Sequence, residues 1–316
     1  MMLTVRETAA LLKSWDNILI LTHVRPDGDT VGCAAALCAG LRALYKTAYL
    51  LPNPELTSLL APYFAPYAAP DDFSPEKVVS VDIATEELFP ENAKIYKGKV
   101  DLAIDHHPSF EKFGKENIVR PEAAACGELL YDIVAQLGPV TPEIALPLYV
   151  AISTDCGCFA YANTTAHTHA VAAALMRTGI DCESVNKAFF RTKSWIYMQL
   201  EGAILRNAAF YDGGRVVLMY VPLSLMESLS AAPGDAEDLS AIGPQIEGVD
   251  CAVTMRELKP DEWKISVRSG KRVNATRVCQ LFGGGGHAAA AGCTIYGTFE
   301  EARQRILAGV AQVAGD

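Results

Sequence analysis

The sequence is poor in positive charge. Its 316 residues include 27 Lys and Arg against 37 Asp and Glu, which gives a formal net charge of -10 at pH 7. A chain with this charge repels a long polyanion and lacks the many cations that neutralise duplex phosphates. The composition therefore argues against binding of long duplex nucleic acid, and any nucleic-acid substrate is expected to be short.

Long apolar runs and a paired cysteine framework are also missing. The first residues, MMLTVRETAALLKSWDN, carry polar or charged side chains throughout and lack the apolar core of a secretory signal. No stretch approaches the roughly 20 apolar residues of a membrane span. The nine cysteines are odd in number and scattered, so we expect reduced thiols buried as small apolar side chains. These features predict a cytoplasmic protein with no membrane association.

The length and the order of the patterns predict two α/β domains, because single cores rarely grow to 316 residues. Over the first two thirds, short β-branched runs alternate with helical stretches. This alternation is typical of a parallel sheet with helices on both faces. The expected strands are 17–22, 77–81 and 100–104, and the expected helices are 31–45, 126–136, 142–153 and 165–178.

The pattern changes near Arg191. One helix is expected over 195–207, and Asp212-Gly213-Gly214 is a hairpin signal. The remainder predicts strands at 215–221, 251–256, 263–268 and 292–296, with helices at 275–282 and 299–313. We therefore expect a first domain over 1–190, a linker helix over 191–209 and a smaller α/β domain over 210–316.

Acidic and histidine side chains follow the ends of the expected strands. The set comprises His23, Asp27 and Asp29 after the first strand, Asp82 after the second, Asp105, His106 and His107 after the third, and Asp155 at the end of a helix. Sites in open α/β sheets form beyond the carboxyl ends of the strands. We therefore expect these side chains to meet at one edge of the sheet.

Converging carboxylates repel one another unless a cation lies between them. Divalent metal is the simplest cation for this place. Oxygen ligands mixed with imidazole nitrogen, and no thiolate, suit manganese, with magnesium or cobalt as substitutes. Two such ions about 3.5–4 Å apart can stabilise both oxygens of an in-line displacement at phosphorus.

Each part of this set is weak by itself. An Asp-x-Asp turn is more often the start of a helix than a pair of ligands, because Asp accepts hydrogen bonds from the first amides of a helix. A lone His is more often packed or solvated than catalytic. The ordered set, with each member at a strand or helix end, favours a functional site over these explanations.

In these motifs the chain resembles the DHH phosphoesterase superfamily. The match covers HVRPDGD, Asp82, the Asp105-His106-His107 triplet and STDCGCFAYANTT in order. Cys33 and the Cys126-Gly127-Glu128 segment stand where small hydroxyl residues are usual in that family. The resemblance implies these metal ligands: His23, Asp27 and Asp82 for one ion, and Asp29, Asp82, His106 and Asp155 for the other.

The resemblance also assigns two further roles in the acidic motifs. Asp105 would lie outside the set of metal ligands and would orient an imidazole ring, which is a usual role for a carboxylate beside a metal-bound histidine. His107 would face the phosphoryl group. We therefore expect Asp105 and His107 to take part in catalysis without binding a metal.

A glycine-rich segment, FGGGGHAAAAGC, lies near the carboxyl end. Four successive glycines expose backbone amides that can surround an anion, although a glycine run alone is more often a flexible loop. A dinucleotide-binding loop fits less well, because these glycines follow a helix and lead into a strand. His287 follows the run directly, and four basic residues precede it, namely Arg268, Lys271, Arg272 and Arg277. Together these features favour a phosphate or carboxylate pocket over a solvated face.

This segment resembles the DHH-associated carboxyl-terminal domain. By that resemblance Arg268 and His287, with Gly284, Gly285 and Gly286, would bind the terminal phosphate of the substrate. The residue after the histidine is Ala288, where many relatives carry a basic residue. Both domains in this order and at this length resemble the nanoRNase and pAp phosphatase group.

The resemblance implies an enzyme that hydrolyses short oligoribonucleotides, linear dinucleotides such as pApA, or pAp. Two divalent ions would serve as cofactors, and the products would be mononucleotides, or AMP and phosphate from pAp. The substrate would be held at both ends, because the second domain captures its far end.

Two alternatives stay open. A manganese-dependent inorganic pyrophosphatase shares the acidic motifs, although the glycine-histidine signature weighs against it. A nucleotide-binding regulator without catalysis is opposed by the intact ligand set. The sequence leaves open the substrate length, the polarity of cleavage, the balance between the two activities and the oligomeric state, for which a homodimer is one expectation.

Overall fold

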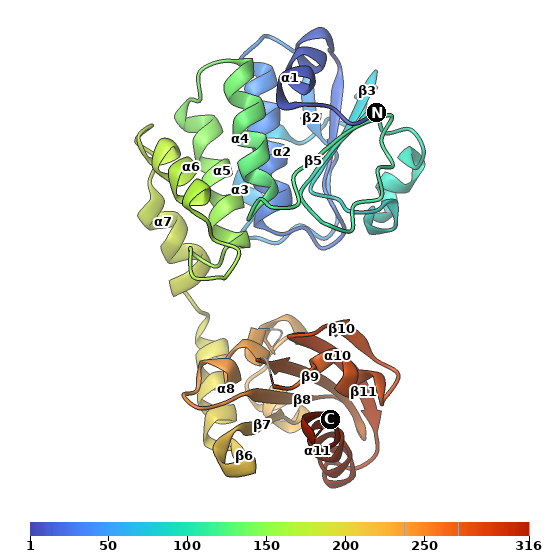
Figure 1. Cartoon of the computed structure of the whole chain (residues 1–316), viewed down its shortest axis with the longest axis vertical. Helices are drawn as coiled ribbons and strands as arrows, with labels where there is room; N and C mark the ends of the chain where they lie inside the picture. The colour runs from blue at the N-terminus through green and yellow to red at the C-terminus, as the bar shows by residue number, and fades with distance from the viewer. Residues whose placement is uncertain (237, 271, 316) are drawn as a thin grey trace. The chain divides into compact units, whose positions relative to one another are not determined.

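The computed structural model describes residues 1–236, 238–270 and 272–315. The chain forms two compact units, residues 1–192 and 193–316 (Figure 1). Lys271, one of the four basic residues of the carboxyl-terminal segment, lies outside the described residues. Within the described part of the chain, every helix falls short of the length and apolar character that crossing a bilayer requires.

A five-stranded parallel sheet forms the centre of the first unit. Its strands are β1 (Ile18–Leu21), β2 (Ala48–Leu50), β3 (Lys77–Val81), β4 (Leu102–Asp105) and β5 (Glu116–Val119), in the order β2-β1-β3-β4-β5. Every neighbouring pair is parallel. The three strands that the sequence predicts, β1, β3 and β4, are adjacent in the middle of the sheet. Their carboxyl ends therefore open at one place.

Four helices cover one face of this sheet (Figure 1). They are α1 (Val5–Ser14), α2 (Gly28–Arg42), α4 (Cys126–Leu137) and α5 (Pro142–Asp155). Helix α2 is almost wholly buried, and its Ala, Gly and Cys side chains allow close approach of α5. A Cβ on Gly28, the first residue of α2, would lie 2.3 Å from Oγ1 of Thr154 near the end of α5. This tight contact fixes the start of α2 against the end of α5, where two of the candidate site residues lie.

The opposite face of the sheet carries a second apolar cluster, which includes Leu19, Leu21, Val78 and Ala103. It is covered by loops and by the short 3₁₀ helices η2 (Glu86–Leu88) and η3 (Glu91–Tyr96). Helices thus flank both faces, as the sequence predicts, although those on this face are single turns. The remaining elements of the unit are α3 (Ala61–Phe64), η1 (Ala65–Tyr67), α6 (Ala166–Met176), α7 (Cys182–Asn186) and η4 (Lys187–Arg191).

The second unit is a smaller α/β structure with a mixed sheet. Its strands are β6 (Ala209–Tyr211), β7 (Val216–Val221), β8 (Cys251–Lys259), β9 (Glu262–Ser269), β10 (Gly285–His287) and β11 (Ala290–Tyr296), in the order β10-β11-β9-β8-β7-β6. Only β7 and β8 are parallel among the paired strands of the described residues. The turn Asp212–Gly214 joins β6 to β7 as the hairpin that the sequence predicts.

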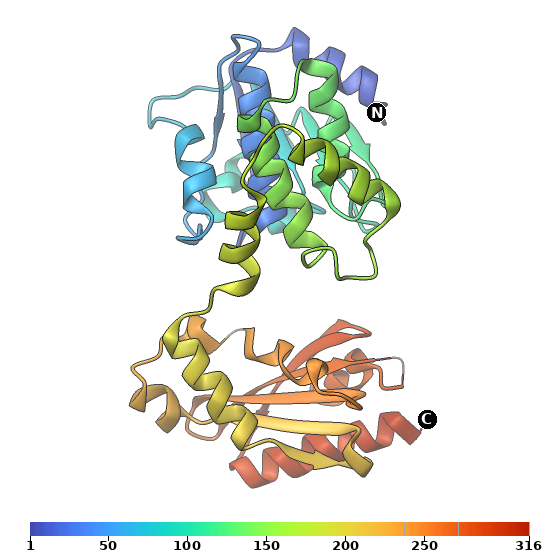
Figure 2. The same cartoon turned by 90° about the vertical axis from the view of Figure 1, so that its left-hand side faces the viewer.

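Helices pack on both faces of this second sheet. Leu200 and Ile204 of α8 (Trp195–Arg206) are buried against Val217 and Met219 of β7. Helices α10 (Ala275–Gln280) and α11 (Phe299–Gly315) cover the other face, and α11 runs along the strands in Figure 2. The short elements of the unit are η5 (Asp212–Gly214), α9 (Leu223–Ser228), η6 (Pro233–Ala236), η7 (Asp238–Ala241) and η8 (Gly243–Gln245).

Candidate active site

The acidic and histidine residues of the first unit meet at the carboxyl ends of the three central strands. Asp82 follows β3 directly, Asp105 is the last residue of β4, and His23 lies two residues beyond β1. Because β1, β3 and β4 are parallel neighbours, these ends lie side by side. They border a pocket of about 450 Å³, which is lined by His23, Val24, Arg25, Asp27, Asp82, Leu88, His106, His107 and Asp155.

Asp27 has two roles at the start of α2. It is the N-cap of the helix, and its Oδ1 accepts hydrogen bonds from the amides of Asp29 and Thr30, at 3.0 and 3.2 Å. The same oxygen lies 3.5 Å from Nε2 of His23. The capping role and a ligand role are therefore compatible, because a carboxylate offers about four lone-pair positions.

Three donors hold the buried carboxylate of Asp29 in place. Its Oδ2 accepts from the amide of Cys126 at 2.7 Å, and its Oδ1 accepts from the amide of Gly127 at 3.0 Å and from the thiol of Cys33 at 3.3 Å. Both amides belong to the first turn of α4, where the helix dipole favours a negative charge. Cys33 and the Cys126-Gly127 pair, which depart from the family pattern, are thus the contacts of this acid.

Seven side chains form three overlapping groups whose ligand atoms lie within 4.8 Å of one another: His23, Asp27 and Asp82 in the first, Asp29, His106 and Asp155 in the second, and Asp82, His106 and His107 in the third. The first two groups contain the six candidate ligands. Asp82 links the groups, because its Oδ2 lies 3.9 Å from Nε2 of His23 and its Oδ1 lies 3.5 Å from Nε2 of His106. Ligand atoms that share one ion at about 2.1 Å lie roughly 3–4 Å apart. In the first two groups the imidazole Nε2 lies 3.5–3.9 Å from the carboxylate oxygens, which matches this spacing.

The donor set fits divalent cations. Oδ1 of Asp82 is buried without a hydrogen-bond partner in the described residues, although an acceptor in that position needs a positive group. Asp82 also holds a left-handed backbone angle, φ of 56°, which is strained for a residue other than Gly or Asn. Carboxylate and imidazole donors without a thiolate suit hard or intermediate ions. The orphaned oxygen and the donor types both point to bound metal.

The electrostatics of the acids point the same way. Burial raises the pKa of Asp29 well above its usual value, and the nearby Asp155 carboxylate raises it further. Burial and then the charge of Asp29 raise the pKa of Asp82 in the same manner. Without a cation these acids resist ionising together, so the folded chain stores repulsion that a divalent ion would relieve.

We expect manganese to raise the melting temperature more at high pH than at low pH. The folded pKa values of Asp29 and Asp82 are raised, so the metal-free folded chain holds more protons than the unfolded chain. The contribution of these two acids to stability is therefore greatest below the unfolded pKa of Asp, about 3.9, and is lost as the pH rises through their folded values. Saturating manganese should raise Tm by about 5–10 °C at neutral pH.

Melting curves with EDTA and with manganese, from about pH 5 to about pH 8, measure this difference. Metal binding also strengthens as the ligands lose protons, so both effects have the same sign. A manganese shift that stays constant or shrinks over this range would contradict the site.

The carboxylate of Asp105 holds the imidazole ring of His107 in place. Its Nδ1 lies 2.9 Å from Oδ1 of Asp105, and Asp105 is fully buried. The hydrogen bond that the ring donates to Asp105 raises the pKa of His107 despite the opposing effect of burial. The side chain of His107 is 41% exposed, so its other nitrogen is accessible from the pocket that it lines. This arrangement suits proton donation or charge stabilisation at a phosphoryl group.

Three residues that line the pocket lie outside the site predicted from the sequence: Val24, Arg25 and Leu88. Arg25 belongs to the HVRPDGD motif, so the signal was present in the segment that supplies three candidate ligands. Leu88 comes from η2, far from any motif, and its carbonyl accepts from the amide of Val24 at 2.7 Å. Only the fold brings that residue to the pocket.

The glycine-rich segment of the second unit is largely structured. Residues Gly285–His287 form β10, an edge strand that pairs with β11. The amide of Gly284 donates to the carbonyl oxygen of Cys279 near the end of α10, at 2.9 Å. This amide is therefore engaged by the fold, and the segment differs from the flexible loop that a glycine run alone suggests.

Close packing explains two of these glycines. A Cβ on Gly284 would lie 2.2 Å from the carbonyl oxygen of Gly292, and one on Gly286 would lie 2.5 Å from that of Ala290. Gly286 also has a φ of 143°, which favours glycine. A Cβ on Gly285, in contrast, would meet nothing within 4 Å among the described atoms. Gly285, like Gly283, therefore leaves the backbone open to a ligand, and of the two only Gly285 lies in β10.

Arg268 and His287 lie on the same face of the sheet. The strand register pairs Arg268 with Ala290, and pairs Ala290 with His287. Directly paired residues point to the same side, so the small Ala290 separates the guanidinium from the imidazole. Arg268 also borders a pocket of about 280 Å³, which is lined by Pro244, Val249, Asp250, Ala252, Arg268, Ser269, Gly270 and Ala289.

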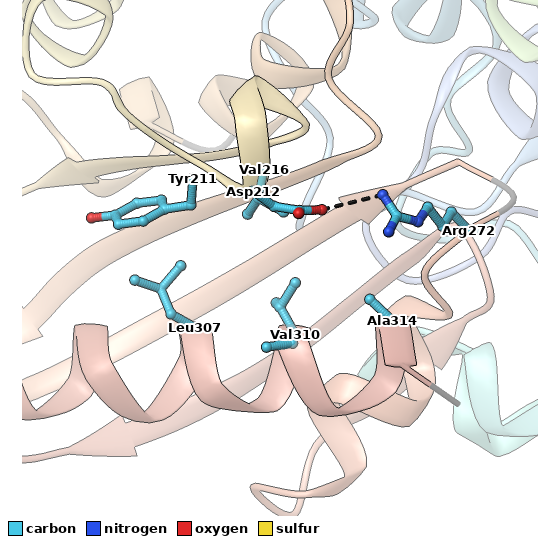
Figure 3. Close-up of a pocket in the computed structure, with 8 residues that line it drawn as sticks. Tyr211, Asp212, Val216, Arg272, Leu307, Val310 and Ala314 are labelled. Carbon is cyan, nitrogen blue, oxygen red and sulfur yellow. Dashed lines mark hydrogen bonds and ion pairs between the residues drawn. The ribbon is translucent and has the colours of Figure 1, made fainter.

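Two of the basic residues near the carboxyl end, Arg268 and Arg272, line different pockets. Arg272 pairs with Asp212, whose Oδ2 lies 3.2 Å from its Nη1, at a second pocket of about 420 Å³ (Figure 3). This pocket is mainly apolar, and its lining is Tyr211, Asp212, Val216, Arg272, Leu307, Val310, Ala311 and Ala314. The structure thus separates Arg272 from the pocket of Arg268.

Comparisons with known proteins match both units. The DHH family, N-terminal domain, matches residues 17–152, and the DHHA1 domain matches residues 216–316. The chain is 33% identical over 310 residues to the bifunctional oligoribonuclease and PAP phosphatase NrnA of Thermus thermophilus. That alignment covers 97% of this chain and 93% of the relative.

Solved structures share the fold. An exopolyphosphatase-related protein from Bacteroides fragilis superposes with a TM-score of 0.86 at 24% identity, covering 98% of this chain and 96% of that one. The exonuclease RecJ bound to manganese gives a TM-score of 0.52 at 16% identity, covering 98% and 94%. Because the Thermus thermophilus relative is 33% identical over nearly the full length of both proteins, the chain belongs to the DHH family of phosphoesterases, with a DHH domain followed by a DHHA1 domain.

Proposed function

We propose that this protein hydrolyses short oligoribonucleotides to mononucleotides, and pAp to AMP and phosphate, at a single site with two divalent ions. The observation that carries the proposal is the pair of ligand groups joined through Asp82. The printed activities of the Thermus thermophilus relative supply the substrate class. The formal net charge of -10 favours short substrates over long duplexes.

Manganese is the ion that we expect in both positions. The manganese-bound RecJ structure has the same fold, and the donor set of carboxylates and imidazoles suits this ion. When bound, two such ions lower the pKa of a water molecule and stabilise developing charge on phosphoryl oxygens. His23, Asp27 and Asp82 would hold one ion, and Asp29, His106 and Asp155 would hold the other with Asp82 shared.

The remaining site residues act on the substrate. We infer that Asp105 fixes the orientation of His107, and that His107 donates a hydrogen bond or a proton to the phosphoryl group. Arg268 and His287 of the second unit would bind a substrate phosphate, with Gly285 giving access to the backbone. Close packing at Gly284 and Gly286 supports the strand on which these residues would meet the phosphate.

A substrate series tests the proposal. Purified protein with manganese should release phosphate from pAp and mononucleotides from pApA and from end-labelled oligoribonucleotides of graded length. The rate should fall as the oligonucleotide grows, because the acidic chain repels additional phosphates. Chromatography of the products and phosphate release measure both activities.

The same series separates the alternatives. An inorganic pyrophosphatase would release phosphate from pyrophosphate and leave pApA intact. A regulator without catalysis would bind pAp tightly and would hold no manganese on metal analysis. Either result would overturn the proposed activity, whereas hydrolysis of pApA and pAp with comparable metal requirements would support it.

A further inference from the structure

Arg25 is a basic residue at the edge of an acidic pocket. It is exposed, and it lines the pocket together with the candidate ligands His23, Asp27 and Asp82. Among the described residues, its side chain makes no hydrogen bond and no ion pair. The guanidinium is therefore available to a ligand, although carboxylates line the same pocket.

The backbone at Arg25 is strained in a way that fixes its position. Its φ is 50°, in the left-handed region, and the next residue is Pro26, which further disfavours a compact conformation at the preceding position.

The residues on both sides of Arg25 are held in place by hydrogen bonds. The amide of Val24 donates to Leu88, the carbonyl of Val24 lies 2.8 Å from Nδ1 of His23, and Asp27 caps α2. Strain kept by such anchors is typical of functional positions.

The net charge of the pocket indicates a role for the Arg25 side chain. The four candidate carboxylate ligands, Asp27, Asp29, Asp82 and Asp155, offset the charge of two divalent ions. An arriving phosphate would then meet a pocket with no net positive charge from metals and acids together. Within the described residues, Arg25 is the only Lys or Arg that lines this pocket. A guanidinium can donate two parallel hydrogen bonds to two oxygens of one phosphate.

We propose that Arg25 binds the non-bridging oxygens of the phosphate that is hydrolysed, and so positions this phosphate against the ligand groups. This role rests on the proposed phosphoesterase function. It differs from the role of Arg268, which borders a separate pocket in the second unit. Arg25 thus supplies a substrate contact that the metal ligands cannot provide.

The test compares Arg25→Gly, Arg25→Ala and Arg25→Lys with the wild type. Gly adopts φ of 50° without strain, so Arg25→Gly removes the side chain without a backbone penalty. Arg177→Ala is the matched control, because Arg177 is an exposed arginine of the same unit that does not line the pocket. Each variant is assayed with pAp and with 3'-AMP, which lacks the 5'-phosphate. Calorimetry measures binding of manganese, and of inorganic phosphate to the manganese-loaded protein.

We expect Arg25→Gly and Arg25→Ala to lower kcat/KM by about 10–100-fold, the usual effect of losing hydrogen bonds to a charged group. The loss should be equal for pAp and 3'-AMP, because the contact is to the reacting phosphate. Phosphate binding should weaken in parallel, whereas manganese binding should stay unchanged. Arg25→Lys should restore part of the loss, and Arg177→Ala should behave as wild type.

Three results would overturn the role of Arg25. These are unchanged phosphate affinity in Arg25→Gly, a loss confined to pAp, and weakened manganese binding, which would indicate a structural role in the ligand turn. A wild type that hydrolyses neither ester would instead refute the proposed function. The phosphate affinities of Arg25→Gly and Arg177→Ala would still decide the assignment of Arg25 in that case.

Discussion

Replacing Asp82 with Asn should abolish the hydrolysis of pAp and of short oligoribonucleotides together. Among the described residues, Asp82 is the only carboxylate that lies within 4.0 Å of both His23 and His106, so its loss should affect both ions. Metal ions stabilise phosphoryl-transfer transition states by several kcal/mol, so kcat should fall by at least about 10³-fold for each substrate. Initial rates under saturating manganese measure both effects.

The same substitution should stabilise the metal-free protein at neutral pH. Burial and the nearby Asp29 disfavour the ionised form of Asp82 and raise its pKa, and an Asn side chain removes this charge at nearly the same volume. Asn also tolerates the left-handed backbone at this position, whereas Ala does so at a cost of about 1–2 kcal/mol. Unfolding in urea with EDTA should therefore rank Asp82→Asn above the wild type, and Asp82→Ala below Asp82→Asn.

A surface acid provides the control for this pair of effects. Asp132 of α4 pairs with Arg120 at 2.7 Å and does not line the pocket, so Asp132→Asn should keep both activities. Retention of either activity in Asp82→Asn would show that the two reactions use different sites. If metal-free Asp82→Asn were less stable than the metal-free wild type, repulsion between Asp82 and the neighbouring acids would not be destabilising the folded chain.

The core of the fold was predictable because its signals are local. β3 has the predicted bounds, and β1 and β4 differ by one or two residues, because buried strands of a parallel sheet are continuous apolar runs. Helix α2 begins at Gly28 rather than at Val31, since Asp27 caps it three residues earlier than the apolar pattern indicates. The T-x-x-E capping box of Thr4 and Glu7 was also readable, and it marks the unpredicted α1.

Other elements depend on partners far along the chain. The edge strand β2 has only three residues, and Gly285–His287 has no intrinsic strand tendency. β10 forms because β11 lies beside it and glycines allow the contact. Such pairing is a property of the tertiary structure, so no local pattern could have shown it.

The candidate site likewise has a part that the sequence predicts and a part that only the tertiary structure shows. The order of acids and histidines at strand ends was enough to name the six residues that the structure gathers, while their roles as ligands stay predictions. The support of Asp29 by amides nearly 100 positions away could not be predicted, because it depends on where α4 packs. Cys33 departs from a family pattern in the sequence, but only the geometry shows that its thiol contacts Asp29.

Replacing Asp105 with Asn should lower kcat by about 10²–10⁴-fold, the range for loss of general acid catalysis, while manganese still binds. Asp105 is not among the candidate ligands, and its Oδ1 lies 2.9 Å from Nδ1 of His107. An Asn amide can donate to that nitrogen, which moves the proton of the ring to Nε2 and removes the negative charge that stabilises the doubly protonated form.

The pH profile distinguishes this role from a structural one. The hydrogen bond that His107 donates to Asp105 raises the pKa of His107, so the protonated imidazole persists to higher pH in the wild type. If protonated His107 assists the reaction, activity is present below this pKa and is lost as the pH rises through it. In Asp105→Asn that loss should move to lower pH, and NMR titration of the His107 ring should show the same downward shift.

A double variant completes the test. If Asp105 acts only through His107, Asp105→Asn combined with His107→Gln should be no slower than His107→Gln alone, because residues that act as a unit are not additive. His107→Gln should itself leave manganese affinity within about threefold, since its Nδ1 is engaged by Asp105 and the ligand groups keep His106. Additive losses, or an alkaline limb that stays in place in Asp105→Asn, would show that the carboxylate supports the fold rather than the imidazole.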